Sequence, residues 1–418
     1  MKDEKTWDWQ AIDKEIPVKE WKDRFNWTEE LNVSPDGEKI AAIVNTDEAE
    51  FSVCVNGEVW EETLEKAWGL RFLPDGRLVA MTANDEEWTV CVDGTFWDTT
   101  FDYIWDLKNS PDGSFIGAAV QTDGKYGMVV NDKVWETLYE NISGVVLSNQ
   151  GTSAAVVQVN KMGQGDIDGF RDGLFSVALD GVAQSGVFMN AWDIAFDSQG
   201  KKVACSLRKN RVDYSIYNNG KAWDKDFQFT WKPEFLDNDS SLIAPVRQGG
   251  KWYIFKDENK FWNNSYDQLW KLAVHQGSGK TAAIVSDSFG KWTVAENDEK
   301  WNLHCETMIS DLFYSENGKS LVAVLKNNNF WNIAVNGKSW NIEADKLWNP
   351  VISSNNEIFA TRMEKDGKFY LIVNGKVYKE QFDMVFEPAI SPDNDKILLK
   401  AIKNGVYKRQ ILTLDNVL

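Results

Sequence analysis

The segment "ELNVSPDGEKIAAIVNTDEAEFSVCVNGEVW", residues 30–60, aligns without a gap with "KLAVHQGSGKTAAIVSDSFGKWTVAENDEKW", residues 271–301. Both contain the apolar run Ala-Ala-Ile-Val, an Asn in the second turn and a closing Trp. Taken alone, "GSGKT" at residues 277–281 resembles the end of a phosphate-binding loop, although the first Gly of that motif is missing. The alignment places it at "SPDG", residues 34–37, where Pro presets φ and Gly accepts a positive φ. We therefore interpret the stretch as a turn within a repeat.

The same kind of turn recurs along the chain, mostly at intervals of about 40 residues. Each unit is predicted to contain four strands. The first precedes the turn, and the second follows it and is rich in Ala, Val and Ile. The third begins with an aromatic residue, and the last begins with Trp. Four short strands in a unit of this length are typical of a β-propeller blade. The turns lie at residues 34–37, 73–76, 110–113, 148–151, 197–200, 236–239, 275–278, 315–318, 353–356 and 391–394.

We therefore predict an all-β protein, a β-propeller of about ten four-stranded blades with a repeat of roughly 39 residues. The tenth unit stops before its Trp-bearing strand, and "EIPVKEW" at residues 15–21 supplies a strand with Trp21. The N-terminal strand is thus expected to close the ring by pairing an exposed edge. Two smaller propellers in tandem are the alternative. Residues 1–14 are interpreted as an N-terminal extension and 15–418 as the propeller, with an insertion loop at 159–173.

Tryptophan is unusually frequent, with 21 residues spread along the chain. One class follows the Asn-Gly-type turn by three residues, a second lies eight residues further on, and a third begins the aromatic-led strand. Because an aromatic ring buries roughly 150–250 Å², we interpret these residues as packing between blades. The first class consists of Trp60, Trp97, Trp135, Trp223, Trp262, Trp301 and Trp340, with Tyr378 in the ninth unit.

The composition is globular, with 43% hydrophobic and 26% charged residues in a chain of 418. The net charge of −19 argues against binding to nucleic acid or to an anionic membrane surface, since both require a basic face. The N-terminus is charged and has no apolar stretch typical of a secretory signal. No apolar run reaches the length of a membrane span, so a cytoplasmic protein is expected.

The sequence offers no residues for a catalytic, cofactor or metal site. Cys54 and Cys91 fill a repeat position that other units fill with Val, Ala or Ile, and Cys205 likewise aligns with Ala, so these thiols are interpreted as packing. His275 and His304 fall in different parts of the repeat, and no Ser lies in a nucleophile elbow. We therefore predict that the protein is not an enzyme and holds no cofactor of its own.

The insertion "VNKMGQGDIDGFRDG", residues 159–173, is the clearest departure from the repeat. Its three aspartates resemble a calcium loop, but the bidentate Glu that completes an EF-hand is absent. A loop that interrupts a regular blade is a candidate partner contact, and a neutral surface insertion is the alternative. The candidate contact residues are Asp166, Asp168, Phe170, Arg171 and Asp172.

The Ser-Pro-Asp-Gly turns and "IAAIV"-like strands resemble the TolB-type and WD-type repeats of propellers over nearly the whole chain, although the turn is degraded in units four to nine. The Trp-rich "VNG-x-x-W" repeat is more closely similar to the TmcD-type subunit of the transmembrane redox complex of sulfate-reducing bacteria. This resemblance implies an accessory subunit on the cytoplasmic side of the inner membrane. Its partners would be an iron–sulfur subunit related to heterodisulfide reductase, a membrane cytochrome b and a periplasmic multihaem cytochrome c. Haem and iron–sulfur clusters are then expected only in those partners.

The sequence supports three hypotheses about the function. The leading hypothesis is a non-catalytic scaffold in a membrane-associated electron-transfer complex. The second is a free-standing protein–protein interaction propeller. The third is a propeller enzyme with its site in the central channel.

Overall fold

The computed structural model describes residues 4–10, 13–161, 163, 165–236, 241–288 and 290–417. Residues 237–239 of the sixth turn, and Leu418, lie outside the described residues. Internal contacts divide the chain into two compact units. Unit 1 comprises Met1–Ser114, Asn329–Asn332 and Trp340–Leu418, and unit 2 comprises Phe115–Asn328 and Ile333–Ser339.

The described residues form ten antiparallel sheets, numbered here in chain order, and unit 1 contains the first, second, ninth and tenth. The first holds β2 (Trp27–Val33), β3 (Ile40–Asp47), β4 (Glu50–Val55) and β5 (Glu58–Val59). The second holds β6 (Lys66–Phe72), β7 (Leu78–Asn84), β8 (Glu87–Val92) and β9 (Thr95–Phe96). The ninth holds β35 (Lys346–Leu347), β36 (Val351–Ile352), β37 (Phe359–Lys365), β38 (Lys368–Val373) and β39 (Lys376–Val377). The tenth holds β40 (Met384–Val385), β41 (Ala389–Ile390), β42 (Lys396–Lys403), β43 (Val406–Thr413) and β1 (Lys14–Ile16).

Unit 2 contains the fourth to seventh sheets. The fourth holds β14 (Ile142–Leu147), β15 (Ser153–Gln158), β16 (Phe175–Leu179) and β17 (Val182–Ala183). The fifth holds β18 (Asn190–Phe196), β19 (Val203–Arg208), β20 (Tyr214–Asn218) and β21 (Lys221–Ala222). The sixth holds β22 (Phe229–Thr230), β23 (Glu234–Phe235), β24 (Leu242–Gln248), β25 (Lys251–Lys256) and β26 (Asn259–Lys260). The seventh holds β27 (Gln268–His275), β28 (Lys280–Ser286), β29 (Trp292–Glu296) and β30 (Glu299–Lys300).

The boundary between the units falls within the third and eighth sheets. The third holds β10 (Tyr103–Asn109), β11 (Ile116–Thr122), β12 (Lys125–Val130) and β13 (Lys133–Val134). The eighth holds β31 (Met308–Tyr314), β32 (Leu321–Asn327), β33 (Phe330–Val335) and β34 (Lys338–Ser339). The described helices are short: η1 (Glu4–Thr6), η2 (Val18–Glu20), α1 (Trp21–Arg24), α2 (Ile167–Asp172) and α3 (Leu414–Val417). The chain is therefore an all-β protein, and its sheets are the blades of a β-propeller with about ten blades, as predicted.

The first sheet shows why the repeat folds into blades. The run from Ile40 to Val44 is fully buried, as expected for a strand covered on both faces. In the preceding turn the Ser34 hydroxyl donates to Asp36 Oδ1 over 2.6 Å, and Gly37 takes a φ of 73° that favours glycine. The second turn is fixed by Asn56, whose Oδ1 accepts from the Ile40 amide over 2.8 Å. Polar side chains thus close both turns around an apolar strand.

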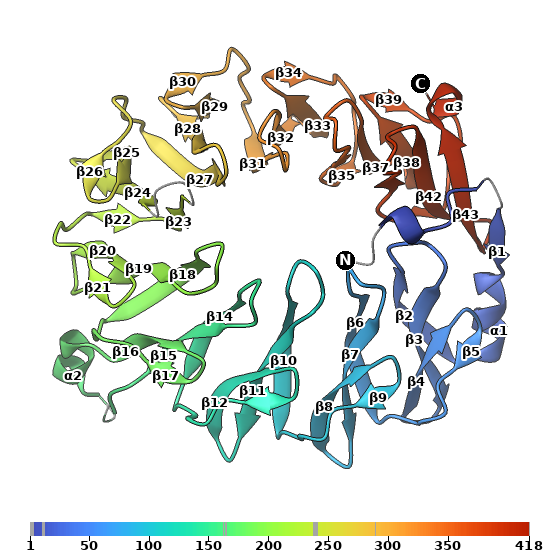
Figure 1. Ribbon diagram of the computed structural model, residues 1–418, viewed down its shortest axis with the longest axis horizontal. Coiled ribbons are helices and arrows are strands. Elements are labelled where there is room, and N and C mark those ends of the chain that lie inside the picture. Colours follow the sequence, from blue (N-terminus) through green and yellow to red (C-terminus); the bar gives the residue numbers. More distant parts are fainter. Residues whose placement is uncertain are drawn as a thin grey trace. The chain divides into compact units, whose positions relative to one another are not determined.

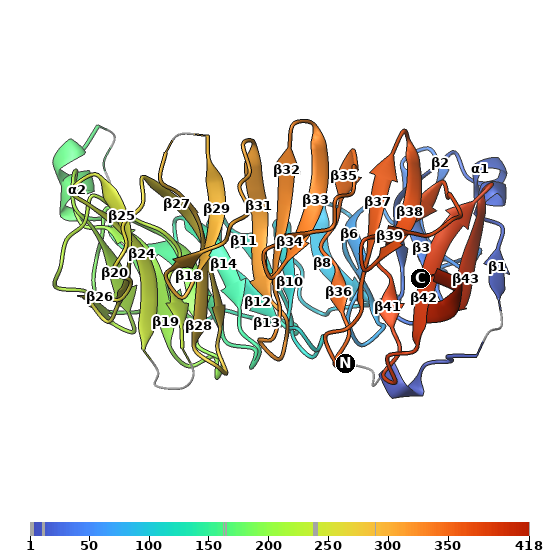
Figure 2. The ribbon, with the colours of Figure 1, turned by 90° about the horizontal axis from the view of Figure 1, so that it is seen from above.

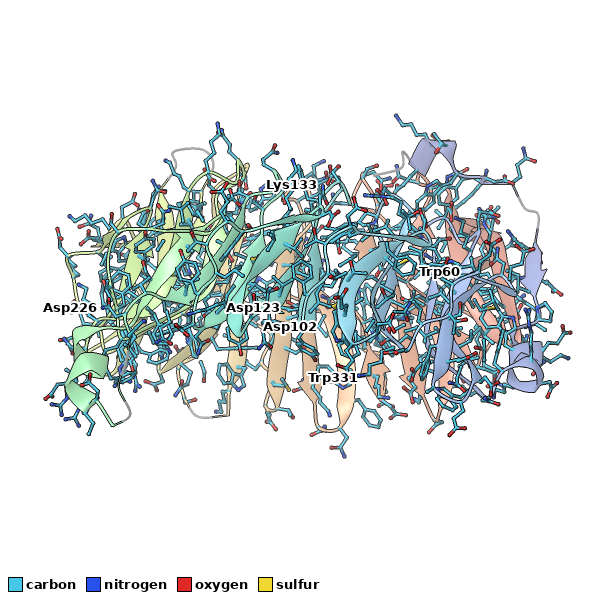
Figure 3. All side chains as sticks on the ribbon, turned by 90° about the horizontal axis from the view of Figure 1, so that it is seen from below. Trp60, Asp102, Asp123, Lys133, Asp226 and Trp331 are labelled. Atoms are coloured by element: carbon cyan, nitrogen blue, oxygen red, sulfur yellow. The ribbon has the colours of Figure 1, made fainter. Side chains whose placement is uncertain are left out.

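The last strand of a blade differs from the prediction. It was expected to open with Trp, but β5 has only two residues and ends at Val59, directly before Trp60. The Trp60 amide still donates to the Val53 carbonyl over 2.9 Å, and the side chain then leaves the sheet edge to pack between the first and second sheets. Trp60 is labelled in Figure 3. The pairing of β5 with β4 therefore ends where the Trp60 indole turns to pack between the two sheets.

Tryptophans of the first class lie beneath the turn of the next sheet. A Cβ placed on Gly94 would lie 3.8 Å from the Trp60 ring, and a Cβ on Gly375 would lie 3.0 Å from Trp340. The same relation joins Trp21 to Gly57 of the first sheet, with a separation of 3.8 Å. Trp21 thus occupies the position that the tenth sheet otherwise lacks. Trp21 therefore takes the predicted place, but it begins α1 rather than standing on a strand.

Strand β1 completes the tenth sheet, as expected for the N-terminal segment. Lys14, Glu15 and Ile16 pair antiparallel with Arg409, Lys408 and Tyr407 of β43. Figures 1 and 2 show β1 beside β43, with α1 leading on to β2. The first and last sheets are also packed together in unit 1, where Ile40 and Val44 share a buried cluster with Tyr407. A single propeller requires this neighbour relation of its first and last blades.

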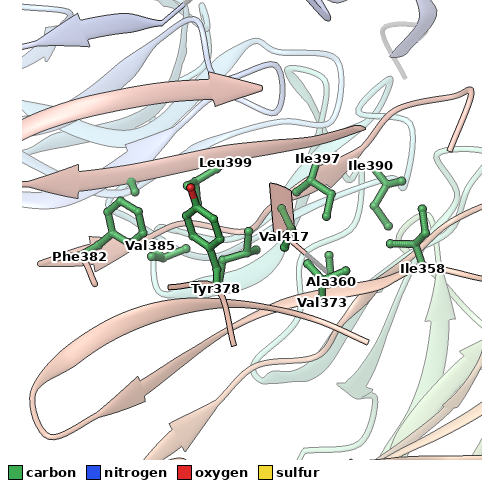
Figure 4. Close-up of a cluster of buried hydrophobic side chains, with 12 residues drawn as sticks. Ile358, Ala360, Val373, Tyr378, Phe382, Val385, Ile390, Ile397, Leu399 and Val417 are labelled. Atoms are coloured by element: carbon green, nitrogen blue, oxygen red, sulfur yellow. The ribbon is translucent and has the colours of Figure 1, made fainter. Parts of the chain in front are cut away.

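A second cluster fills the space between the ninth and tenth sheets. Figure 4 shows Tyr378 and Phe382 from the ninth unit among aliphatic side chains such as Leu399 of β42. Val417 of α3 packs into the same cluster. The core therefore consists of apolar layers between neighbouring sheets, which hold the polar features described below in fixed positions.

Candidate functional site

The predicted contact loop contains a short helix that sequence analysis did not foresee. Asp166 caps α2, since its Oδ1 accepts from the Gly169 amide over 2.8 Å. Asp168 forms an exposed ion pair of 3.1 Å with Arg171, a contact worth little in water. Ile167 and Phe170 lie three residues apart on α2 with 64% and 36% of their surfaces exposed.

Asp166 and Asp168 of the insertion each have another role among the described residues. Asp166 is engaged as a cap and Asp168 in the ion pair, while the side chain of Asp172 lies outside the described residues. Among the described residues, no group of three or more His, Cys, Asp or Glu side chains could hold a metal ion. The five candidate residues stay a prediction of a contact surface.

The stretch that resembles a phosphate loop is a hairpin turn between β27 and β28. The Gly279 amide donates to the His275 carbonyl over 2.9 Å, and Lys280 Nζ donates to the Gly318 carbonyl over 2.9 Å. Thr281 accepts a hydrogen bond of 3.2 Å from Trp262 Nε1 in the sixth sheet. The turn opens a strand rather than a helix, so it lacks the array of helix amides that binds phosphate.

Cys54, Cys91 and Cys205 are buried among apolar residues, as predicted, and Cys305 is buried as well. All four are free of disulfides in the described chain. Burial raises the pKa of each thiol, to about 12 for Cys91. Thiols in such surroundings are neutral and poorly nucleophilic at pH 7.

A second departure from the repeat lies in the ninth and tenth sheets of unit 1. Strand pairing aligns Arg362 of β37 and Lys400 of β42 with Ile43 of β3. We call this the Ile43-equivalent position. The other units fill it with uncharged residues: Met81, Ala119, Val156, Ser206, Pro245, Ile284 and Val324.

Proline interrupts the first strand opposite both cations. In the ninth sheet Pro350 separates β35 from β36, and in the tenth Pro388 separates β40 from β41. Proline has no amide hydrogen to donate, so the ladder is broken there. Pairing is kept two residues before each proline, where the Trp348 amide donates to Arg362 O over 3.3 Å and the Phe386 amide to Lys400 O over 2.8 Å.

Two adjoining cavities lie at these interruptions. One of about 310 Å³ and one of about 400 Å³ share Trp348, Arg362 and Glu387 in their walls. Lys400 and Asn32 line the larger cavity. The arrangement therefore brings two cations and one acid to a hollow with an indole wall.

Arg362 is held in place from two sides. Its Nη1 donates to the Val385 carbonyl over 2.9 Å, and its guanidinium carbon lies 4.7 Å from the centre of the Trp348 ring, a cation–π contact. Its Nε is buried and has no hydrogen-bond partner among the described residues. Burial lowers the pKa of Arg362, and the charge of Glu387 partly offsets this.

Lys400 is a buried cation, with only 5% of its surface exposed. Its Nζ donates to the carbonyls of Ser34 and Pro35 over 3.4 and 3.1 Å. Burial lowers the pKa of Lys400 to about 8, against the favourable charges of Glu387 and Asp36.

The turn of the first sheet is further fixed by two buried residues of β43. Tyr407 Oη donates to Gly37 O over 2.7 Å, and Arg409 Nε lies 2.8 Å from Glu38 Oε1. Arg409 also donates to the carbonyls of Asp36 and Asp8. Sequence analysis missed this group and the cavity, although a cation within an Ala/Val/Ile-rich strand was a visible signal.

No family model matches the chain, and no curated protein matches it in sequence. Two solved structures align along most of its length. One, described as a crystal structure of the eukaryotic initiation factor, is 12% identical with a TM-score of 0.46, covering 91% of this chain and 90% of that chain. The other, described as the Dos1 propeller, is 10% identical with a TM-score of 0.33, covering 91% of this chain and 92% of that chain.

Proposed function

We propose that the protein is a non-catalytic scaffold that binds other proteins. The observation that carries this proposal is the α2 insertion, which presents Ile167 and Phe170 at the surface between β15 and β16. The exposed Val187 lies beside the C-terminal end of α2, since a Cβ on Gly173 would lie 3.1 Å from Val187 Cγ1. Exposed apolar side chains rimmed by charges are typical of a protein-binding surface.

We further propose that its partners belong to a membrane-associated electron-transfer complex. The support is the resemblance of the Trp-rich repeat to the TmcD-type subunit. On this proposal the chain holds an iron–sulfur subunit related to heterodisulfide reductase and a membrane cytochrome b, in a complex with a periplasmic multihaem cytochrome c. Haem and iron–sulfur clusters belong to the partners, and the chain lies on the cytoplasmic side of the inner membrane. None of the described helices has the length and apolarity to cross a bilayer.

Co-purification tests both levels of the proposal. The full chain is tagged in its native cells, membranes are solubilised in mild detergent, and the recovered proteins are identified with their haem and iron–sulfur absorption. We expect redox subunits to be retained. Recovery of unrelated proteins would contradict the redox assignment and support a free-standing interaction propeller. Recovery from the soluble fraction with no partner would contradict the scaffold itself.

A matched pair of variants locates the contact. The double change Ile167→Asp and Phe170→Asp should release the partners, because it places two charges in the apolar surface. Val377→Asp serves as the control, since this valine is also exposed but lies in β39 of the other unit. Equal retention by both variants would show that α2 is not the contact.

A further inference from the structure

We propose that the cavity beside Arg362 and Lys400 binds a small organic carboxylate with an apolar body. The starting observation is that the two sheets carrying cations at the Ile43-equivalent position are neighbours. In each of the two, a proline interrupts the first strand opposite the cation. The position is filled with uncharged residues elsewhere, so packing of a blade does not require the cations.

Arg362 presents the group that a carboxylate recognises. The Nε–H and one terminal N–H of a guanidinium form an edge that matches the two oxygens of a carboxylate. The Nε of Arg362 is buried without a partner, while Nη1 and the ring face are already engaged by Val385 and Trp348. These two contacts fix the orientation of the guanidinium, so less freedom is lost on binding.

The residues that line the larger cavity include two cations, Arg362 and Lys400, and one acid, Glu387. Lys400 faces Glu387, Asp36, Arg362 and Arg409. Asp36 is engaged within its own turn by the Ser34 hydroxyl and the Glu38 amide, and Arg409 is paired with Glu38. Asp36 and Arg409 do not line the cavity, so Glu387 is the acid that stands beside the two cations in its wall. An added anion would balance the second cation.

The apolar wall indicates what the anion is attached to. Trp348, Phe369, Met384 and Phe386 line the larger cavity beside the cations. Its volume of about 400 Å³ lies within the range of small-molecule sites, which are apolar with a few convergent polar groups. An aromatic or aliphatic acid can contact both the apolar side chains and the cations of the wall, whereas an inorganic anion can contact only the cations.

Benzoate is the probe for the test, titrated into the full-length chain by isothermal calorimetry. We expect saturable binding at one site and binding of neutral benzamide at least about tenfold weaker, because benzamide lacks the charge. Equal binding of the two, or no saturable binding of benzoate, would overturn the proposal. Binding of inorganic phosphate in preference to benzoate would also count against it.

Variants test the residues. Arg362→Met and Lys400→Met should each weaken benzoate binding at least about tenfold, whereas Lys346→Met should leave it unchanged. Lys346 is a suitable control because it is an exposed lysine of the ninth sheet, paired with Glu364. Wild-type affinity in Arg362→Met would contradict the proposal.

Glu387→Gln gives a test that does not depend on removing a buried residue. It takes away the acid that competes for the cations, so benzoate should bind more tightly. Unchanged or weaker binding would contradict the charge argument. Affinity of the wild type should fall as the pH rises from 7 to 9.5, because Lys400 loses its proton over this range, and a constant affinity would exclude Lys400 from the site.

Discussion

Tryptophan in this protein acts mainly as an inter-sheet packing residue, and individual positions differ sharply. Trp262 is 2% exposed and donates to Thr281 of the next sheet, whereas Trp27 at the start of β2 is 50% exposed. We expect Trp262→Ala to lower the free energy of unfolding by about 3–5 kcal/mol, because it empties a buried aromatic site. Trp27→Ala should cost less than about 1 kcal/mol. Urea unfolding compares the two, and equal losses would contradict the packing interpretation.

Lys400 should make stability depend on pH. Its folded pKa of about 8 lies below the usual value of 10.5, so between these values the unfolded chain binds the proton and the folded chain does not. Stability from this group therefore rises with pH through that window. The free energy of unfolding of the wild type should therefore rise between pH 8 and pH 10 relative to that of Lys400→Met. The relative gain should be on the order of 1 kcal/mol or more. Urea unfolding at the two pH values checks this, and parallel profiles would show an unshifted lysine.

At the level of elements, the turns of the first and second sheets share a backbone conformation but differ in the side chains packed around them. Gly37 and Gly76 close equivalent turns with φ values of 73° and 87°. A Cβ on Gly37 would lie 3.2 Å from side-chain carbons of Lys400 and Arg409, whereas a Cβ on Gly76 would meet no atom within 4 Å. Gly76→Ala should cost about 1 kcal/mol from backbone strain alone, and Gly37→Ala clearly more. Thermal unfolding distinguishes the two variants. Equal shifts in melting temperature would mean that the side chains of Lys400 and Arg409 move aside without cost.

Sequence reasoning worked best for these elements, because their signals are local. The turn at residues 34–37 and the apolar run after it specify a hairpin without reference to the rest of the chain. Helix α2 was missed because six residues carry too little periodicity, and only the cap at Asp166 marks its start. The cavity was missed for another reason. Arg362 and Lys400 stand in adjacent units of the sequence, but their approach to Trp348 and Glu387 depends on how the proline-broken strands fold.

At the level of the whole molecule, the N-terminal segment should determine the stability of the first and last sheets. Removing residues 1–21 exposes the edge of β43 and empties the place of Trp21 beneath Gly57. We expect the melting temperature to fall by about 5 °C or more. Trp21→Ala, which keeps β1, should give part of this loss. An unchanged melting temperature in the truncated chain would contradict the role assigned to β1.

The contacts between neighbouring sheets also bear on the order in which the chain folds. Asn32 bonds to Leu70 and Trp231 to Leu269, each across 38 residues, whereas Tyr407 bonds to Gly37 across 370. Closing a long loop costs more chain entropy than closing a short one, and contacts distant in sequence slow folding. Contacts between sheets that are adjacent in sequence can thus form early. The pairing of β1 with β43 forms late, because it brings together the two ends of the chain. Refolding followed at Trp21 should therefore lag behind refolding followed at Trp262.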